Sequence, residues 1–497
     1  MAGQDGRATV GPLPDAAVSR PLVPRLLTGL VWLLWLASLG VAVARPLVEG
    51  PWRLGNLVAV DGLTLVMWVA VTFFSGIVHS YSRRYMAGDR GVEGFFARSF
   101  AFTLTVLLLV AAESLLLFAA AWVLMGLIMA DLVGHDRDWP QARAAARLTR
   151  RYLLAGGGLL AVAFGTLWLT TGTTTVSGVA AAATSLRASP GPFALVAVAL
   201  VLAAAVQSAL VPFHGWLLGS MTAPTPASAL MHAGFVNAGG ILLARVAPLL
   251  TVEPALLLSV AAVGATSALL GKPLKSVQPD VKRRLGCSTV GQMGFMTMQA
   301  GLGFFAAAIT HLVLHGCYKA YRFLSAGGRV EHTAPDPDDE PETVGLVGLA
   351  ATAVTALAGG AVFTLLTGKG TSADGGLLLT LLVVLTTLRT ARGAVGRTSL
   401  PATVRYVAVP VVFLPAIAVY GGVYVVVASA MADLPVVTAP TGLHPLHAVL
   451  AVAFLLAYVA VERGAYARSR RLYVALVNAT QPPGDTLLTT RREYDER

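Results

Sequence analysis

Charged side chains are scarce in this chain. They make up 12% of its 497 residues, whereas 56% are hydrophobic, and the mean hydropathy is +0.72. A soluble domain carries roughly 25% charged residues, so this chain has too few charges to cover a water-facing surface. A bilayer removes that requirement, because protein surface that faces lipid is apolar. The low charge therefore excludes an ordinary soluble protein and favours an integral membrane protein.

Cysteine is almost absent as well. The two cysteines, Cys287 and Cys317, both lie in apolar segments, which argues against a disulfide framework. No CxxC or HxxxH pattern occurs outside one histidine segment described below, and we recognise no phosphate loop or nucleophile–base pair. We therefore expect no metal, no cofactor and no enzymatic activity of its own in this chain.

Long hydrophobic runs fill most of the sequence. Runs of about 18 residues or more recur along its whole length, and each is long enough to cross a bilayer. They predict an all-α, polytopic membrane helix bundle of about 14 transmembrane helices. The expected spans are 25–45, 57–79, 97–112, 114–134, 152–171, 193–222, 226–247, 254–273, 284–301, 303–326, 344–366, 374–394, 403–430 and 444–462.

The distribution of arginine supports this count. The net charge is +11, but the basic residues lie in short loops between apolar runs, which is typical of cytoplasmic loops and argues against nucleic-acid binding. Segments 80–96, 135–151 and 274–283 are basic, whereas segment 172–192 is rich in Thr, Ala and Ser. The alternation predicts a multi-pass protein of the cell membrane, surrounded by lipid, with both termini cytoplasmic.

Three regions follow from this reading. Residues 1–24 are expected to form a disordered cytoplasmic tail, residues 25–462 the transmembrane domain, and residues 463–497 a cytoplasmic C-terminal tail. Residues 331–343 read as an acidic, proline-containing inner loop. The stretch 466–477 fits either a short amphipathic surface helix or a solvated tail.

Prolines interrupt one of the apolar runs. Pro212 lies inside it, and Pro224 and Pro226 end it. A proline removes a backbone donor, and in a bilayer that is tolerated where the backbone lines protein or a water-filled cavity. Discontinuous helices of this kind often mark an ion pathway, although a kinked structural helix is the simpler alternative.

Ionisable residues recur in a later apolar run. His311, His315 and Lys319 are spaced at i, i+4 and i+8, so they share one helix face and form a stripe that can pass protons. A polar interface between packed helices is the alternative, and a zinc site lacks a third ligand. His232, just after the proline break, is expected to face the same interior. The carboxylates Asp61 and Glu113 read better as groups at outer turns, with Glu113 solvated.

These residues carry a resemblance to a known family. Pro212-Phe-His-Gly-Trp, followed by Ala223-Pro-Thr-Pro-Ala-Ser-Ala-Leu-Met-His-Ala, resembles the most specific motif of the proton-conducting subunits of respiratory complex I and Mrp antiporters. Gln278-Pro-Asp-Val-Lys-Arg and His311-Leu-Val-Leu-His-Gly-Cys-Tyr-Lys-Ala match as well. The likeness spans residues 57–330 and fades to hydropathy alone after residue 344. It implies an antiporter-like fold and an ion pathway along His232, His311, His315 and Lys319, with Lys282 and Asp280 near the inner mouth.

The departures from the family are informative. The family places a glutamate after the tryptophan of its fifth helix, where Val123 follows Trp122 here, and a lysine five residues before the broken-helix proline, where Gln207 stands. A matching lysine in the second half is not identified, since Lys369 sits beside an outer loop. Such features resemble the DabB branch, the membrane subunits of two-subunit inorganic-carbon accumulation complexes. That resemblance implies a partner, DabA, with a zinc site like that of a β-carbonic anhydrase.

Three functions stay open at this point. The chain is expected to conduct protons, or Na⁺, and thereby to drive hydration of CO2 to bicarbonate in the zinc-bearing partner. Alternatively, it is a subunit of a cation/proton antiporter or of a complex I or hydrogenase-type pump, against which the missing glutamate and lysine argue. A non-conducting scaffold is the third reading, against which the buried His–His–Lys stripe argues.

Overall fold

The computed structural model describes residues 22–47, 50–326, 345–395 and 402–481. The predicted N-terminal tail therefore lies outside the described residues except for its last three, 22–24, which already belong to the first helix. The acidic segment 331–343 and the end of the C-terminal tail, 482–497, lie outside them too.

The described chain is helical almost throughout, as its apolar runs predict. Its long helices are α1 (Leu22–Ala44), α2 (Gly62–Tyr85), α3 (Val92–Ala111), α4 (Leu115–Val133), α5 (Pro140–Thr171), α7 (Pro190–Gln207), α12 (Pro254–Ser276), α13 (Val281–Gly301), α14 (Phe305–Leu324), α15 (Leu346–Thr367), α16 (Gly376–Val395), α17 (Ala402–Ala430) and α18 (Pro445–Glu462). Shorter pieces are η1 (Arg45–Leu47), α6 (Gly178–Arg187), α8 (Gly215–Gly219), η2 (Ser220–Thr222), α9 (Thr225–Ala233), η3 (Phe235–Asn237), α10 (Ala238–Arg245), α11 (Ala247–Thr251), α19 (Ala465–Arg468) and α20 (Arg470–Thr480). One hairpin, β1 (Trp52–Leu54) and β2 (Val58–Val60), is antiparallel.

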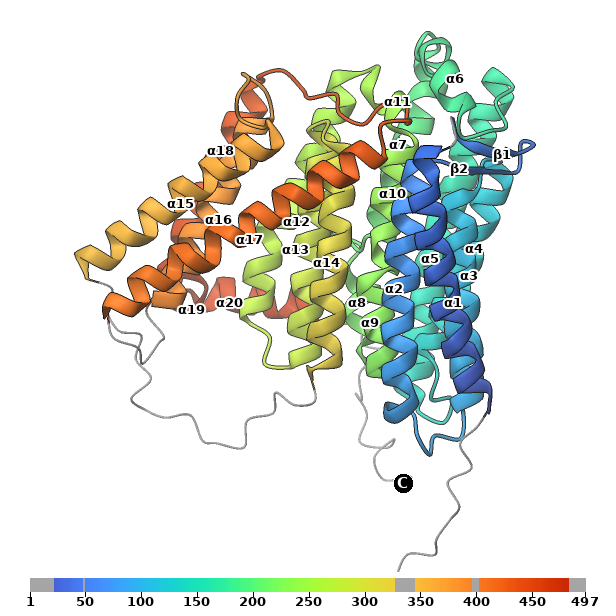
Figure 1. Ribbon diagram of the computed structural model, residues 1–497, viewed down its shortest axis with the longest axis horizontal. Coiled ribbons are helices and arrows are strands. Elements are labelled where there is room, and N and C mark those ends of the chain that lie inside the picture. Colours follow the sequence, from blue (N-terminus) through green and yellow to red (C-terminus); the bar gives the residue numbers. More distant parts are fainter. Residues whose placement is uncertain (1–21, 48–49, 327–344, 396–401, 482–497) are drawn as a thin grey trace, which may run out of the picture.

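Among these residues, twelve helical segments are long and apolar enough to cross a membrane. The segment Thr225–Arg245, which joins α9, η3 and α10, is one of them. Helices α13 and α14 have 21 and 20 residues and run alongside these segments, although they are more polar (Figure 1). Counted together, they match the predicted number of about 14, and the prediction of a polytopic helical membrane protein is confirmed.

The helices form a large bundle with a smaller one beside it. Figure 1 shows α1 to α11 on one side, α12 to α14 in the centre, and α15, α16 and α18 on the other side. Helix α17 runs obliquely from that side across the central helices and contacts α14. Within the central group α13 packs on α12, and Gly294 and Gly301 allow it, because a Cβ on either glycine would overlap the backbone of α12. Small residues thus bring these two helices into close contact.

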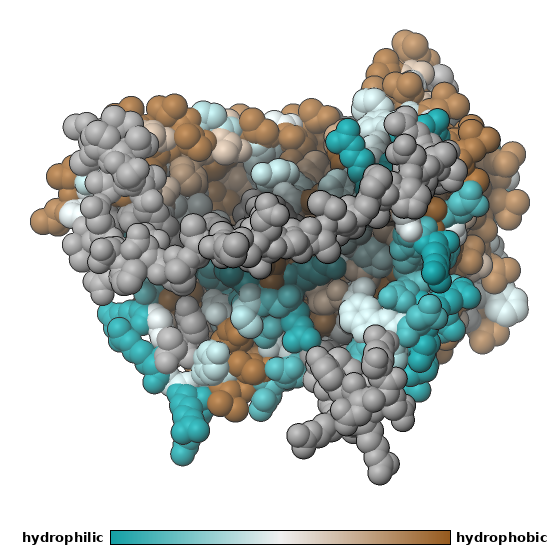
Figure 2. Space-filling view, turned by 90° about the horizontal axis from the view of Figure 1, so that it is seen from below, coloured by the Kyte–Doolittle hydropathy of each residue, from teal (hydrophilic) through white to brown (hydrophobic). Residues whose placement is uncertain are grey.

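Loops of different charge lie at opposite ends of the bundle. The hairpin, α6 and α11 lie at the upper end in Figure 1, whereas the α2–α3 turn, the α12–α13 turn and α20 lie at the lower end. Seen from below, hydrophilic residues gather right of centre and at the lower left of that face, and hydrophobic residues lie along its upper and right edges (Figure 2). The basic segments therefore share one end, as the arginine pattern predicts.

Two carboxylates at the upper end are partnered. Asp61 caps the first turn of α2 through the backbone N–H of Thr64 and forms a buried ion pair with Arg245. Glu113 is 5% exposed, and one oxygen lies 3.0 Å from Arg53 Nη1. The interpretation of Glu113 as a solvated turn carboxylate is therefore wrong, because β1 folds back over the turn between α3 and α4 and supplies the arginine.

Helix ends differ from the sequence prediction in two places. Helix α5 begins at Pro140, so the arginines of the expected loop 135–151 lie mostly on its first turns. In the C-terminal region α20 forms, and Leu476 on its inner face packs against Leu274 and Cys287. Of the two readings of residues 466–477, the helix is the one observed.

Candidate functional site

The proline-containing run is a discontinuous helix, as predicted. Helix α7 ends at Gln207, and the chain is not α-helical again until α8, with Pro212 in the interruption. Backbone groups in the break are bound by side chains: Trp216 Nε1 donates to the Val206 carbonyl at 2.9 Å, and Val211 N donates to Ser267 Oγ at 3.0 Å. These bonds satisfy backbone groups that the lost helical turn would otherwise leave unpaired in an apolar layer.

A second interruption follows directly. Pro224 precedes α9 and Pro226 lies in its first turn, and α9 itself ends at Ala233 before η3. Gln207, which stands where the family has a lysine, is 1% exposed and donates from Nε2 to the Phe235 carbonyl at 3.1 Å. The side chain of Gln207 therefore joins the ends of the two broken helices.

The predicted histidine–lysine stripe lies on α14 and faces the interior. His315 and Lys319 are 5% and 0% exposed, and the His311 and His315 rings stack with their centroids 5.8 Å apart. Neither ring nitrogen of His315, nor Nε2 of His311, has a hydrogen-bond partner within the described part of the chain. Gly316 lets α14 come close to α9, because a Cβ there would press on Phe74 and on the Ala233 carbonyl.

His232 joins this stripe from α9. Its Nδ1 lies 2.9 Å from Thr289 Oγ1, and its ring stacks on Phe323 with centroids 4.4 Å apart. The Thr289 hydroxyl donates to the Leu285 carbonyl at 3.0 Å, and Lys319 Nζ donates to the same carbonyl at 2.8 Å. Because the Thr289 hydroxyl proton is already donated to the Leu285 carbonyl, neutral His232 donates from Nδ1 to Thr289 Oγ1. Its Nε2 is then an acceptor, for which the described part of the chain offers no partner.

The remaining predicted residues lie at the lower end. Lys282 Nζ donates to the Ala223 carbonyl at 2.9 Å, so it links α13 to the segment just before α9. Asp280 caps α13 by accepting from Arg283 N at 2.7 Å, which is a structural bond. The interior stripe and Lys282 thus surround the proline break, whereas Asp280 turns to the helix end.

Helix α20 covers part of this end. His214, inside the break, lies with Nε2 2.8 Å from the Ala479 carbonyl. Gln278, which precedes α13, donates to Thr480. The C-terminal helix is thereby tied to the break and to the turn between α12 and α13, and the sequence motifs gave no sign of this contact.

Lys369 was placed beside an outer loop by its position in the sequence, but its side chain is 4% exposed. Its Nζ lies 3.2 Å from the centroid of the Tyr424 ring and also faces Phe304 and Phe363, at 5.4 and 5.9 Å. No hydrogen-bond partner for Nζ is found in the described residues, and burial lowers the pKa of Lys369 to about 7. Phe304 and Tyr424, both distant from Lys369 in the sequence, complete this site, so spacing could not reveal it.

His79 on α2 is a second buried ionisable group that the sequence analysis did not select. It is 1% exposed, and its Nδ1 donates to the Ser75 carbonyl at 2.8 Å. Ser75 in turn lies 2.6 Å from Thr103 Oγ1. A lone histidine in an apolar run was the available signal. No group of three or more His, Cys, Asp or Glu side chains among the described residues is arranged to hold a metal ion.

Comparisons with known proteins agree with this arrangement. Residues 112–347 match the model of the membrane region of NADH:quinone oxidoreductase and Mrp antiporters, and residues 54–96 match the model of the N-terminus of complex I chain 5. In the solved Mrp complex from Dietzia sp. DQ12-45-1b, one chain superposes with a TM-score of 0.56 at 22% identity, over 95% of this chain and 51% of that one. This likeness concerns the fold.

Curated relatives give closer sequence matches. "Probable inorganic carbon transporter subunit DabB1" of Halothiobacillus neapolitanus is 40% identical over 57% of this chain and 51% of its own length. The corresponding DabB of Bacillus subtilis is 37% identical over 61% and 57%. NADH-quinone oxidoreductase subunit L of Escherichia coli is 35% identical over 56% and 46%. The match thus spans about half the length of these relatives.

The motif-bearing part of the chain, with its broken helix and its buried histidines, is the part that these comparisons cover. The resemblance to the DabB subunits is confirmed, and residues 54–96 and 112–347 are similar to membrane subunits of complex I and Mrp antiporters.

Proposed function

We propose that this chain is the cation-conducting membrane subunit of an inorganic carbon accumulation complex. In this role it conducts protons down their gradient and so energises one-way hydration of CO2 to bicarbonate in a zinc-bearing partner subunit like DabA. The observation that carries the proposal is the buried group of His232, His315 and Lys319 beside a broken helix, with the half-buried His311 next to His315.

Burial of these groups favours transport over a scaffold role. A charged or strongly polar side chain at membrane depth costs several kcal/mol unless it is paired, so a plain anchor gains nothing from it. Here neither nitrogen of His315 has a hydrogen-bond partner among the described residues, and Lys319 binds one carbonyl. Groups that can gain and lose a proton without breaking a hydrogen-bond network are suited to proton relay.

The polar groups suggest a route between the two ends. From the lower end the proton passes Lys282 and reaches Lys319 and His232 at the break. It continues along His315 and His311, and then to Gln299 and Tyr420, whose side chains lie 3.5 Å apart and line the same cavity as His311.

Lys369 is the next group on the upper side, since it contacts Tyr424, one turn from Tyr420 on α17. With Lys369 included, this route connects the two ends of the bundle through groups from α13, α14 and α17.

The driving force is sufficient for the proposed coupling. Hydration of CO2 to bicarbonate releases one proton, and removal of that proton pulls the reaction forward. One charge that crosses 100 mV supplies about 2.3 kcal/mol, which shifts an equilibrium roughly 50-fold. The glutamate that the family places after Trp122 and the lysine that it places at the position of Gln207 are absent. The first half of the domain therefore lacks the charged residues that a pump of this family uses.

Growth of cells tests this proposal. The chain is expressed with its DabA-like partner in cells that lack carbonic anhydrase, and growth in air is scored. We expect rescue by the unchanged pair, and loss of rescue with Lys319→Ala or His315→Ala. Cys317→Ala, at an exposed position of the same helix, serves as the matched control. If both stripe variants still rescue growth at normal membrane levels, these side chains do not carry the coupling.

A second candidate is a subunit of a cation/proton antiporter or of a complex I-type pump. The similarity to subunit L of E. coli favours it. Sodium dependence separates the two: an antiporter subunit requires Na⁺ for proton movement, whereas we expect proton movement in the carbon-accumulating complex to be indifferent to Na⁺.

A further inference from the structure

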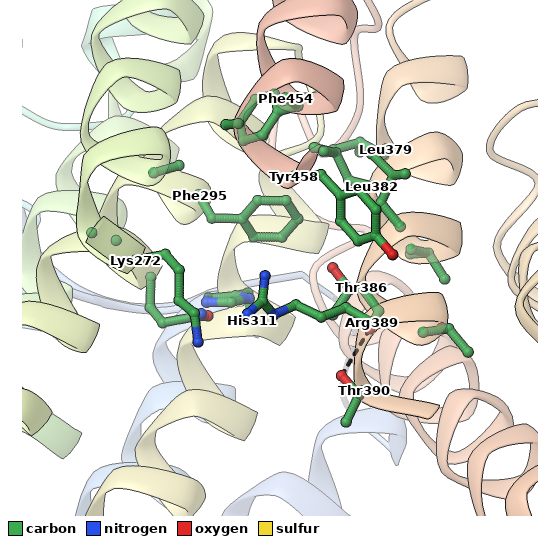
Figure 3. Close-up of a pocket in the computed structure, with 18 of the residues that line it drawn as sticks. Lys272, Phe295, His311, Leu379, Leu382, Thr386, Arg389, Thr390, Phe454 and Tyr458 are labelled. Carbon is green, nitrogen blue, oxygen red and sulfur yellow. Dashed lines mark hydrogen bonds between the residues drawn. The ribbon is translucent and has the colours of Figure 1, made fainter. Parts of the chain in front are cut away.

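A large cavity lies between the central helices and the smaller bundle. Its volume is about 630 Å³, within the range of known ligand sites, and its walls come mainly from α12, α13, α16, α17 and α18. Leu379, Leu382 and Phe454 line its apolar part (Figure 3). Because these walls belong to helices that cross the membrane, the cavity is suited to a hydrocarbon chain.

One end of the cavity is basic. Lys272 and Lys275 of α12 line it. Arg389 extends from α16 toward Lys272 (Figure 3). The three are close enough for their charges to interact, and Arg284 of α13 adds another positive charge nearby. All of these residues lie near helix ends on the lower side of the bundle.

Among the residues that the structure describes, little negative charge lies there. Glu462 Oε1 lies 3.0 Å from Arg389, and its other oxygen lies 3.9 Å from Arg392. Neither Lys272 nor Lys275 forms an ion pair or a side-chain hydrogen bond with any described residue. One carboxylate is thus shared among several cations, and an external anion at this end would relieve their mutual repulsion.

We propose that this cavity binds an anionic phospholipid, with its phosphate on Lys272, Lys275 and Arg389 and an acyl chain along Leu382 and Phe454. Basic pockets between membrane helices bind anionic headgroups, and here the apolar cavity continues directly from the basic end. A small soluble anion would use the basic end alone and leave the apolar part unexplained.

The site also touches the proposed ion pathway. His311 lines the same cavity, and its Nε2 has no partner among the residues that the structure describes. A bound acyl chain would therefore shield one side of the His–Lys stripe from water. The lipid site does not depend on the proposed function, because binding is measured without transport.

Native mass spectrometry of the purified full chain tests the site, with phosphatidylglycerol and phosphatidylcholine as probes. We expect one phosphatidylglycerol to bind, at least tenfold more tightly than phosphatidylcholine. The triple variant Lys272→Gln, Lys275→Gln, Arg389→Gln should lose that preference. A control triple variant at exposed arginines of the same end, Arg83→Gln, Arg84→Gln, Arg90→Gln, should keep it.

A second variant separates a lipid from a soluble anion. Ile417→Trp fills the apolar part and leaves the basic end intact, so it should weaken phosphatidylglycerol binding at least tenfold. Competition by inorganic phosphate at equal concentration, or unchanged lipid binding in both cavity variants, would overturn the proposal. Loss of preference in the control triple variant would overturn it as well, because general surface charge would then explain the binding.

Discussion

Replacement of Lys369 by methionine is expected to stabilise the protein at neutral pH and to remove part of its pH dependence. The amine sits among Tyr424, Phe304 and Phe363 with no hydrogen-bond partner in the described chain, and burial lowers the pKa of Lys369 from 10.5 to about 7. Methionine has a similar length and no charge, so it keeps the packing and removes the buried amine.

The sign and size follow from proton linkage. Between pH 7 and 10.5 the unfolded lysine holds a proton that the folded one lacks, so the free energy of unfolding rises with pH. The slope approaches about 1.4 kcal/mol per pH unit, and because the folded lysine is half protonated at pH 7, the rise from pH 7 to pH 9 is about 2.3 kcal/mol. At pH 7 and below, burial of Lys369 lowers the free energy of unfolding by at most about 5 kcal/mol. Cation–π attraction to the aromatic rings offsets about 0.5–2 kcal/mol of that loss.

Thermal unfolding in detergent measures this effect. The entropy of unfolding is about 2.1 cal/mol/K per residue. For a chain of this length, a change of about 1 kcal/mol in the free energy of unfolding therefore shifts the unfolding midpoint by about 1 °C. We expect the midpoint difference between the Lys369→Met variant and the unchanged protein to shrink by about 2–3 °C from pH 7 to pH 9. Thr371→Ala, at an exposed position in the same loop, is the control, and its unfolding midpoint should have the same pH dependence as that of the unchanged protein. Equal pH dependence of the Lys369→Met variant and the unchanged protein would refute the reasoning.

Two further predictions concern stability. Arg245→Ala leaves Asp61 buried without its partner, and we expect a loss of about 3–5 kcal/mol in thermal unfolding, against less than about 1 kcal/mol for the exposed pair variant Arg187→Ala. Burial alone would raise the pKa of Asp61, but the charge and hydrogen bonds of Arg245 and the bonds from Thr64 hold it below 3.8, so this stabilisation is present above pH 4 and is lost on further acidification. Leu476→Asp should release α20 and speed trypsin cleavage near Arg470 at least tenfold, whereas Leu472→Asp, at an exposed position, should not; equal cleavage of both variants would contradict the docking of α20.

Much of the fold follows from the sequence because the relevant signals are local. Apolar length predicts each span, and the spacing of His311, His315 and Lys319 predicts their common face. Pro212 predicts the interruption after α7, since a proline removes a helical donor wherever the chain goes next. None of these inferences requires knowledge of which helices are neighbours.

The contacts that sequence reasoning missed depend on neighbours. Lys369 packs against Phe304, just before α14, and Tyr424 of α17, which lie 65 and 55 residues away along the chain. Glu113 is buried because Arg53 folds over it from the hairpin. The lipid cavity requires Lys272 and Arg389 to meet, which depends on how the smaller bundle leans against α12. Such pairings carry no periodicity that a single sequence could display.

Proton flux through the reconstituted complex tests the central claim most directly. The chain and its DabA-like partner are placed in liposomes that contain a pH-sensitive dye, and a potential of about 100 mV is imposed. We predict acidification that is abolished by Lys319→Met, reduced at least tenfold by His315→Ala, and unchanged by Cys317→Ala. Equal flux in the Lys319→Met variant and the unchanged complex, or no flux above that of empty liposomes, would contradict the account.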